Sequence, residues 1–591
     1  MMFDTKQLRG PFYGLPDAGF SSLSCASPAA TREAITVLMR SIDRNFYAIH
    51  ALSNWLAPIN RLPDEVLVEI FSLANPTRQS SCTCEPRFPP TRATHPAYIG
   101  SPCWAPLMLV CRHWHALILQ TPRLWRAVDV WTRSPEHFAF ACKNLWRGTL
   151  ELALHDQKSV RILFLFDFMT PRISKLVLPP LECKYLRFAL GALRHRQWPR
   201  LEELTVLGQC HYPARHAEAP QIDLSKDCFP MLSSLCLSSL AVSWEVGQVS
   251  RLRRLELVDC AHVGSPLTLD GFLDVLDVCP DIEELRLRNF LSSVTMPRSR
   301  SRRQRRTVLL PHLKDFGLHD ELSRMLEVLN AVYFPPETRV HIGAVSPIQN
   351  EDGSGDLDPY KVDLKQLLPD DPERLPLQWS ATSGRIEARD GMIRAVAMAG
   401  TAHLVLDLDT KLDFGQWTAQ LVPQAIRGFF DVFSRARMRS VTLVGSTQDL
   451  NASDYHEILE YFLELEVLRI EDQWDADYEG GSHKVEDVFD VLAYMSERPG
   501  VHEDDPWDEF VLGPSLKTLD LVQLEWTERS LEAVKRSLRF RAENGHTLEE
   551  LRLELLFPTV PPGREFEAFR ERTCAELREL VPSVKVTIQR A

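Results

Sequence analysis

A six-residue pattern, Leu-x-x-Leu-x-Leu, recurs along most of this chain and constrains its fold more than any other feature. Apolar residues that alternate with polar ones over such a segment are typical of a strand with one buried face. The early occurrences begin 31, 20, 30 and 31 residues apart, and the last two begin 32 apart. With Ile, Val or Phe allowed at apolar positions, the pattern starts at Leu201, Leu232, Leu252, Ile282, Leu313, Leu465, Leu516 and Leu548.

One strand recurring at this spacing predicts a solenoid, in which successive strands lie side by side. The apolar residues of each strand then point into a continuous core, and the residues between them face outward. Proline precedes several of the strands, where it ends the previous segment. The alternative is a non-repeating α/β domain that contains the same six-residue pattern by chance. Further strands are expected at 149–154, 160–166, 403–408 and 440–444.

The solenoid is expected to cover residues 148–591, with loops at 292–308 and 347–379 where charged residues, Pro and Gly interrupt the pattern. The first loop carries a dense basic run in an otherwise acidic chain. This run is either a nuclear-import or polyanion-binding segment or a solvated insertion between repeats. Its arginines are Arg298, Arg300, Arg302, Arg303, Arg305 and Arg306.

The N-terminal part has a different pattern, because its apolar residues recur at helical spacing and do not alternate as in a strand. Residues 1–26 are expected to form a flexible tail, and residues 27–56 a helix that Ser27-Pro28 can start. Two interpretations of this helix stay open: an amphipathic helix packed on the next module, or a dimerising coiled coil. The apolar residues recur as Ile35, Leu38, Ile42, Ile49, Leu52 and Leu56, with Asn45 in one seam position.

A second helical module follows. A helix is expected over 60–74, with Pro63 in its first turn and acidic residues at its N-terminus. Residues 75–103 lose all periodicity and are rich in Pro, Ser and Cys, so they are expected to form a loop. A helix then resumes near Pro106, runs to about Gln120, and gives way to Leu124-Trp125.

Three segments of this module, in order, resemble the F-box family: Leu62-Pro63-Asp64-Glu65-Val66-Leu67, Val110-Cys111-Arg112-His113-Trp114 and Leu124-Trp125. The family joins its helices by a short turn, whereas here the loop 75–103 is inserted. The resemblance implies an F-box-like domain over 57–130 that docks a Skp-type adaptor. The partner-binding residues that it implies are Leu62, Pro63, Val66, Ile70, Phe71, Val110, Trp114, Leu124 and Trp125, each of which could instead belong to the core of the module.

The region behind this domain resembles the irregular leucine-rich repeats found behind F-boxes, and the heptad helix followed by 57–63 looks like the layout of F-box families in mushroom-forming fungi. The expected fold class is α+β to α/β: a helical F-box module, then a solenoid with a strand plus a helix or loop in each repeat. The resemblance implies a non-catalytic adaptor that recruits a protein substrate to a cullin-type ubiquitin ligase. The alternative is a leucine-rich-repeat scaffold outside any ligase.

Composition sets the remaining expectations. A net charge of −13 disfavours a nucleic-acid binder. The thirteen scattered cysteines suggest reduced, buried thiols. The sequence contains no apolar run long enough to predict a membrane-spanning helix. We therefore expect the protein in the cytoplasm, the nucleus or both. No catalytic motif is present, and no cofactor or metal is expected. The cysteines and histidines at 82, 84, 95, 103, 111, 113 and 115 lack the usual spacing of zinc ligands.

Overall fold

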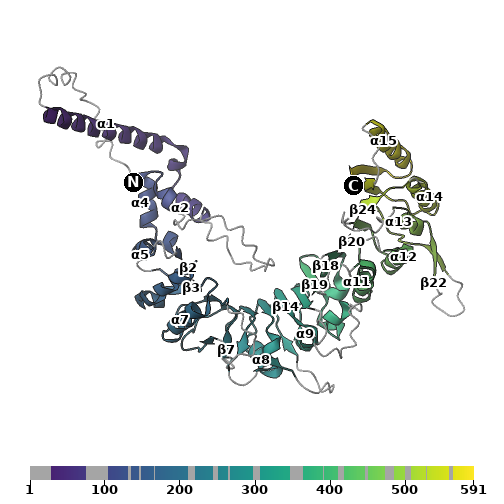
Figure 1. The fold of residues 1–591 in the computed structure, drawn as a ribbon, viewed down its shortest axis with the longest axis horizontal. Coiled ribbons are helices and arrows are strands. Elements are labelled where there is room, and N and C mark those ends of the chain that lie inside the picture. The colour runs from purple at the N-terminus through teal and green to yellow at the C-terminus, as the bar shows by residue number, and fades with distance from the viewer. Residues whose placement is uncertain are drawn as a thin grey trace. The chain divides into compact units, whose positions relative to one another are not determined.

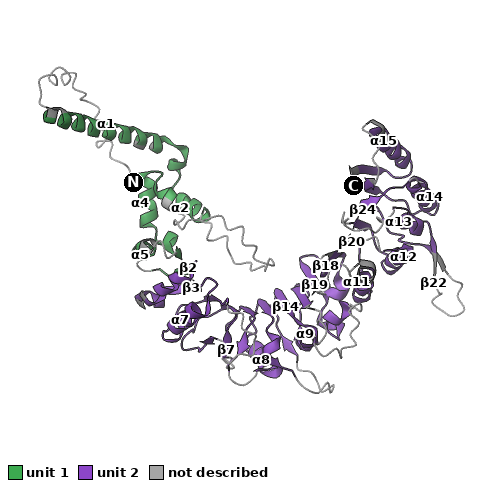
Figure 2. Ribbon diagram, in the orientation of Figure 1, with its two compact units in different colours: residues 1–152 green, residues 153–591 purple. Residues whose placement is uncertain are grey.

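The computed structural model forms two compact units, residues 1–152 and residues 153–591 (Figures 1 and 2). It combines helices and strands, with helices concentrated near the N-terminus, which is consistent with an α+β fold. The residues that it describes are 28–74, 104–130, 135–145, 148–165, 167–209, 220–243, 250–263, 267–296, 307–345, 364–389, 392–409, 418–445, 450–472, 485–498, 508–527, 529–557 and 564–590.

Unit 1 is mostly helical. Its long first helix, α1, spans Pro28–Leu56, and a short turn of 3₁₀-helix follows at once. The proline in the first turn of α1 costs no hydrogen bond, because the first amides of a helix have no partner within it. The other elements are η3 Pro58–Arg61, α2 Asp64–Leu73, α3 Trp104–Met108, α4 Arg112–Gln120, η5 Pro122–Trp125, β1 Ala127–Val130, α5 Pro135–Asn144 and β2 Leu150–Leu154, in which the division between the units falls.

The single helix expected from about Pro106 to Gln120 is two helices in the structure. The chain leaves helical geometry at 109–111, and Cys111 is extended, with φ −158° and ψ 165°. Its Sγ accepts a hydrogen bond from the backbone N–H of Trp114 at 3.5 Å, so Cys111 caps α4 instead of lying inside it. A capping side chain satisfies an amide that would otherwise lack a partner at the helix start.

The main sheet of unit 2 runs from β3 to β26, and most neighbours in it are parallel. Over long stretches, strands that follow one another in sequence are also neighbours in the sheet. Because these neighbours are parallel, each connection must return from the end of one strand to the start of the next. The strands are β3 Ile173–Val177, β4 Glu203–Leu207, β6 Ser234–Ser238, β8 Arg254–Val258, β11 Glu284–Arg288, β14 Asp315–Glu321, β16 Arg339–Val345, β17 Ser383–Arg389, β18 Met392–Ala399, β19 Ala402–Asp409, β20 Ser440–Gly445, β21 Val467–Asp472, β24 Thr518–Glu525, β25 Glu550–Phe557 and β26 Ser583–Arg590.

The register of this sheet aligns the six-residue patterns with one another. Leu204 pairs with Leu235, Leu235 with Leu255, and Leu255 with Leu285. The column continues to Phe316, and all five side chains are at most 1% exposed. A second apolar column follows two residues later in each strand, so the sequence repeat becomes a continuous buried layer.

One part of the sheet departs from the parallel order. β16 pairs with β19, and β18 lies between β19 and β17, antiparallel to both. β17 then returns to parallel pairing with β20. Of these three strands, only the region of β19 was expected from the sequence. The reversal needs no crossover helix, because antiparallel neighbours can be joined by a short turn.

Helices and short second strands connect the main strands, and Figure 1 shows helices such as α7, α8, α9, α12 and α13 along one side of the strand row in unit 2. The buried residues of α7, α8 and α9 are Leu, Ala, Val, Phe and Met at helical spacing. The helices are α6 Ile162–Leu165, α7 Cys183–Arg194, α8 Leu269–Asp277, α9 Leu322–Leu329, α10 Leu377–Ser380, α11 Thr418–Phe433, α12 Ala452–Tyr461, α13 Val485–Leu492, α14 Ser530–Glu543 and α15 Arg564–Arg578.

The second strands form separate small sheets beside the main one. Parallel pairing joins β5 to β7 and β7 to β9, β10 to β12, and β13 to β15, whereas β22 and β23 are antiparallel. Their bounds are β5 Gln221–Asp223, β7 Ala241–Ser243, β9 Ala261–His262, β10 Leu267–Thr268, β12 Val294–Thr295, β13 Val308–Leu309, β15 Val332–Tyr333, β22 Met495–Arg498 and β23 Asp508–Val511.

Three expectations for unit 2 need correction. The strand expected at 160–166 is absent, because η6 Gln157–Arg161 and α6 occupy the described part of that segment. The loop expected at 292–308 contains β12 and the start of β13, and its basic run lies outside the described residues. Within 347–379, residues from 364 onward form η9 Leu364–Leu367, η10 Pro372–Arg374 and the start of α10, with Leu364, Leu367 and Leu377 buried.

Candidate functional site

The helix α2 of unit 1 presents three distinct faces. Residues on a helix are rotated by about 100° from one to the next, so positions three and four apart share a face. One face is buried and carries Leu67, Val68, Phe71 and Ser72. A second face is acidic and exposed, and a third is apolar and exposed. An exposed apolar face on a folded module is a candidate surface for a partner.

The buried face of α2 packs on α4 and η5. The Phe71 ring lies 4.8 Å from the Trp114 ring, and the two side chains are 1% and 8% exposed. Leu124 and Trp125 are each 2% exposed, and the Trp125 indole donates a 2.8 Å hydrogen bond to the Ile118 carbonyl. The expectation that these four side chains bind a partner is corrected, because they form the core of the module.

The exposed apolar face retains two expected residues of α2, Val66 and Ile70, which are 42% and 37% exposed. Leu73, which the sequence analysis did not single out, extends this face with an exposure of 69%, and its spacing of three residues from Ile70 was the signal that could have identified it. Two further exposed apolar residues precede the helix: Leu62, at 37%, and Ile59, in η3, at 39%. We call Ile59, Leu62, Val66, Ile70 and Leu73 the docking stripe.

Pro63 lies beside the stripe at the start of α2. It is exposed, its φ of −56° suits the residue before a helix, and its carbonyl accepts the amides of Val66 and Leu67 at 3.0 and 3.1 Å. Val110 is exposed as well, at 47%, and its neighbour Leu109 at 86%. Both lie at the corner between α3 and α4, so this corner is a second exposed apolar point of the module.

Polar contacts fix the elements around α2. The Trp114 indole donates to Asn60 Oδ1 at 2.6 Å, and the Asn60 amide donates to the Asn54 carbonyl, so Asn60 ties η3 to both α4 and α1. At the surface, His113 Nε2 lies 3.2 Å from Asp64 Oδ1. The sequence analysis missed Asn60, because its two partners lie on different helices.

The structure offers no metal site within the residues that it describes: none of them form a cluster of three or more His, Cys, Asp or Glu side chains suited to an ion. The cysteines and histidines at 82, 84, 95 and 103 lie outside the described residues. In unit 2, Cys228, Cys236, Cys260 and Cys574 are free thiols, as expected. Cys183, at the start of α7, is disulfide-bonded and departs from the expectation of reduced thiols.

Unit 2 has a second candidate surface, formed by the residues that alternate with the buried columns of the main sheet. We call this surface the strand face. It is strongly charged, and neighbouring strands exchange ion pairs across it. The pairs include Arg254–Glu284 at 3.4 Å, Arg286–Asp315 at 3.1 Å, Arg339–Asp315 at 3.6 Å, Arg394–Asp407 at 3.0 Å and Arg469–Asp520 at 2.8 Å.

Charges of both signs are therefore interleaved on the strand face. Most of these pairs are partly exposed, so each contributes little to stability. Their arrangement instead defines a pattern of electrostatic potential, which a partner protein with the complementary charges would match.

Histidines occupy the middle of this face. His341 Nε2 lies 2.7 Å from Asp407 Oδ2, which also receives the guanidinium of Arg394. Burial lowers the pKa of His319, and nearby Arg288 and His341 lower it further. Burial likewise lowers the pKa of His403, helped by Arg339. His319 and His403 therefore favour their neutral forms near pH 7.

Comparison with known families finds a match for the module that carries the first of these two surfaces. Residues 59–130 match the family model described as F-box-like. The chain thus carries an F-box-like domain, which supports an F-box protein with an adaptor role in protein–protein interaction. F-box domains are typically non-catalytic and typically bind Skp-type adaptors. No curated protein matches the sequence. Among the described residues, every helix is too short or too polar to cross a membrane.

Proposed function

We propose that this protein is a substrate-recruiting adaptor of a cullin-type ubiquitin ligase. The observation that carries the proposal is the exposed apolar docking stripe within a segment that matches the F-box-like family. In this role the protein performs no chemistry itself, since other subunits transfer ubiquitin. It would act in the cytoplasm, the nucleus or both.

The docking stripe suits a groove-and-helix interface. Val66 and Ile70 lie on one side of α2, Leu62 lies just before the helix, and the buried face of α2 is fixed by Phe71 and Trp114. The stripe is therefore held on a rigid support, which lowers the entropy lost on binding. Apolar residues spaced like these are the usual anchors of a helix that enters an apolar groove.

A pull-down of the full chain with a purified Skp-type adaptor tests this docking. The variant Val66→Glu with Ile70→Glu puts two charges into the stripe. Losing one anchor typically costs about 2 kcal/mol or more, so we expect binding to fall at least about 30-fold.

The matched control is Ala116→Glu with Gln120→Glu. These two exposed residues have the same spacing on α4, on the side opposite the buried Trp114 and Ile118. The control should bind normally. If the unaltered chain fails to bind the adaptor, the ligase role is excluded, and a leucine-rich-repeat scaffold outside any ligase becomes the better explanation.

We further propose that unit 2 is an irregular leucine-rich-repeat solenoid whose strand face holds the target protein. The aligned columns from Leu204 to Phe316 support this interpretation, as does the short second strand in several repeats. In leucine-rich repeats the six-residue pattern is followed by Asn or Cys, and Cys260 occupies that position after Leu252.

The contacts of Cys260 explain why a polar residue suits that position. Its buried Sγ lies within hydrogen-bonding distance of the carbonyls of Leu237 and Val258, at 3.5 and 3.4 Å. Burial raises the pKa of this thiol to about 12, so it remains a donor. The preceding residues, Ser239, Asp259 and Asn289 in three successive repeats, all adopt φ values between 49° and 57°. The same turn therefore follows β6, β8 and β11.

Target recruitment can be tested by proximity labelling with the full chain. The variant Arg394→Glu with Arg469→Glu reverses two cations of the strand face, and we expect it to change the set of labelled proteins while adaptor binding persists. A control that reverses two surface charges on the helices, Arg536→Glu with Arg570→Glu, should leave the set unchanged. An unchanged set in the strand-face variant would exclude this face as the target surface.

A further inference from the structure

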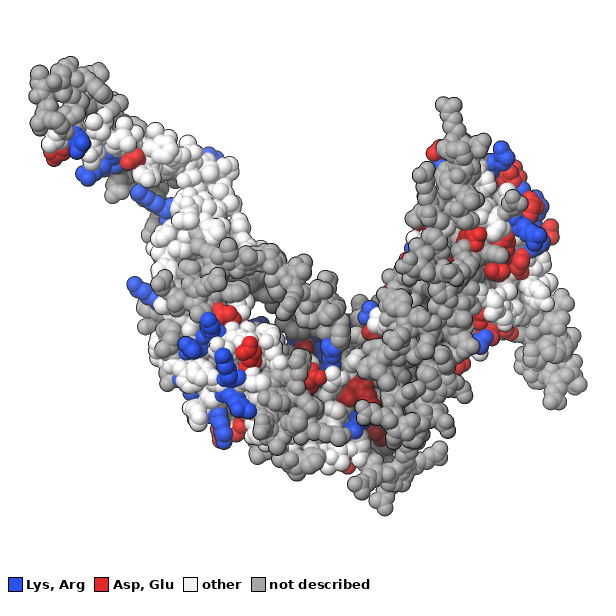
Figure 3. Space-filling view, viewed as in Figure 1, with Lys and Arg blue, Asp and Glu red and all other residues white. Residues whose placement is uncertain are grey.

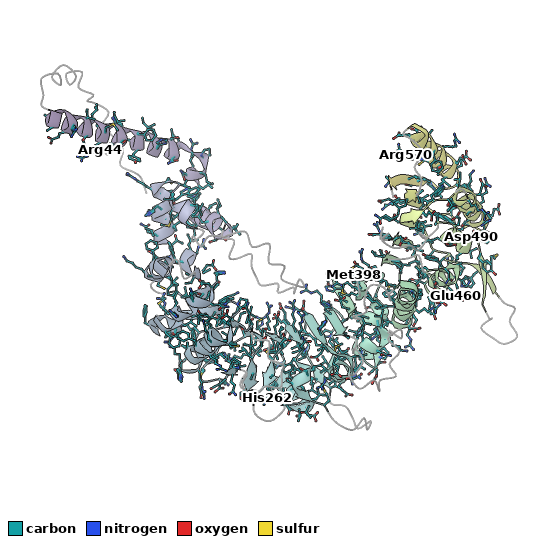
Figure 4. All side chains as sticks on the ribbon, in the orientation of Figure 1. Arg44, His262, Met398, Glu460, Asp490 and Arg570 are labelled. Carbon is teal, nitrogen blue, oxygen red and sulfur yellow. The ribbon has the colours of Figure 1, made fainter. Side chains whose placement is uncertain are left out.

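The helix α1 carries an apolar stripe that the other described residues leave exposed. Ile35, Ile42, Ile49, Leu52 and Leu56 are between 45% and 56% exposed. The helix contacts η3 next to its own C-terminus. Much of its surface in Figure 3 is uncharged, and Figure 4 marks Arg44 as one of its few charged side chains. Long apolar stripes of this kind mark an interaction site.

The stripe has the arrangement of a two-stranded coiled-coil seam. Ile35, Ile42, Ile49 and Leu56 occupy every seventh position, the a positions of a heptad, while Leu38 and Leu52 occupy d positions. β-branched residues at a with Leu at d favour parallel pairs of helices. The residues at a and d therefore indicate a pair of helices, and not only the presence of a seam.

The residues beside the seam suit pairing with an identical helix. In a parallel pair, each g residue faces the e residue of the next heptad in the other copy, and like charges there would repel. Here g and e residues face each other as Ala34 with Met39, and Ser41 with Phe46. From Glu33 to the end of the helix, the charged residues lie at the outer b, c and f positions. They are Glu33, Arg40, Asp43 and Arg44, whereas Arg32, before the seam begins at Ile35, lies at an e position.

We propose that α1 pairs in parallel with α1 of a second copy of this chain. Asn45, the one polar residue of the seam, is the reason to favour a second copy of the chain over another partner. A polar side chain in an apolar seam needs a hydrogen-bonding partner, and in a parallel pair in register the second copy supplies its own Asn45 at the same level. A wholly apolar partner surface would leave Asn45 without one.

The size of the seam sets the expected strength of the pair. From Ile35 to Leu56 the seam extends about 32 Å. The six aliphatic side chains of the seam, five of them about half exposed, give in the two copies together roughly 400–700 Å² of buried apolar surface. Met39 and Phe46 add to this, but the total stays below the ~1,200 Å² of a standard stable interface. We therefore expect a dimer that dissociates on dilution. Its parallel order would bring the starts of both F-box-like domains together.

Sedimentation velocity of the full chain between about 1 and 100 µM, a range that brackets micromolar association, tests the pairing. The mass should rise from 67.5 kDa toward twice that value with concentration. Ile42→Glu with Ile49→Glu should remain a monomer throughout. The control Val37→Glu with Tyr47→Glu, at exposed positions outside the seam on the same helix, should dimerise like the unaltered chain. Circular dichroism checks that all three stay helical.

Asn45→Asp and Asn45→Lys variants test the register. In a parallel pair each variant alone places like charges together, whereas a mixture places Asp against Lys. We expect each variant to be monomeric and the mixture to dimerise. A monomeric unaltered chain at every concentration would overturn the proposal. Dimerisation of the Ile42→Glu with Ile49→Glu variant, or a mixture no more dimeric than its components, would overturn it too.

Discussion

Two neighbouring residues of α2, Phe71 and Ile70, should respond to truncation in opposite ways. Phe71 is 1% exposed and packs its ring 4.8 Å from that of Trp114, whereas Ile70 is 37% exposed. Replacing a buried Phe by Ala removes its transfer free energy and leaves a cavity, at a cost of about 3–5 kcal/mol. Replacing Ile70 by Ala removes only a half-exposed side chain, which should cost about 1 kcal/mol or less.

The assay is hydrogen exchange of the α4 amides in the full chain, because a local measurement avoids assuming that the whole protein unfolds in one step. Since about 1.4 kcal/mol is a factor of ten, Phe71→Ala should speed α4 exchange by roughly 100-fold or more. Ile70→Ala should change it by less than about tenfold while weakening adaptor binding. Equal exchange in the two variants would refute the division of α2 into a core face and a docking face.

Three further outcomes concern unit 2. Arg541, fully buried, donates to the carbonyls of Leu512, Gly513 and His546, so Arg541→Met should destabilise the 508–546 region by about 3 kcal/mol or more, measured by hydrogen exchange there. Gly384→Ala would place its Cβ 2.4 Å from the Phe429 ring and should lower the melting temperature, whereas Gly191→Ala, with open space around it, should not. His319 and His403 have pKa values lowered by burial, so the unfolded chain binds protons more readily. Their contribution to the free energy of unfolding is present above about pH 6.5 and is lost as the pH falls below it. The double variant His319→Gln with His403→Gln should make the free energy of unfolding, measured by urea titration between about pH 5 and 7, depend less on pH.

The strands of unit 2 were largely predictable, because the signal for a half-buried strand is local. Each Leu-x-x-Leu-x-Leu segment, such as the one from Leu252 to Leu257, contains its own alternation of buried and outward residues. The antiparallel excursion through β17 and β18 was not predictable in this way. Those strands lack the pattern, and their direction depends on turns and on pairing with strands distant in sequence.

The candidate site was predictable only in part. The order of the segments around Pro63, Cys111 and Trp125 led to the F-box resemblance, and the family match at 59–130 agrees with that resemblance. Which side chains face outward depends on how the helices pack. Trp114 and Trp125 are buried because neighbouring helices cover them, and no single segment contains that information.

The amino-acid sequence by itself determined where the strands with the repeated pattern form, where the docking module begins, and which residues could line a core or a seam. These properties depend on spacing along one segment. Only the tertiary structure decided that Phe71 belongs to the core and Ile70 to the surface, that Cys111 caps α4, and that α1 keeps its apolar stripe exposed. Burial is a property of a residue's neighbours in space, and those neighbours come from other parts of the chain.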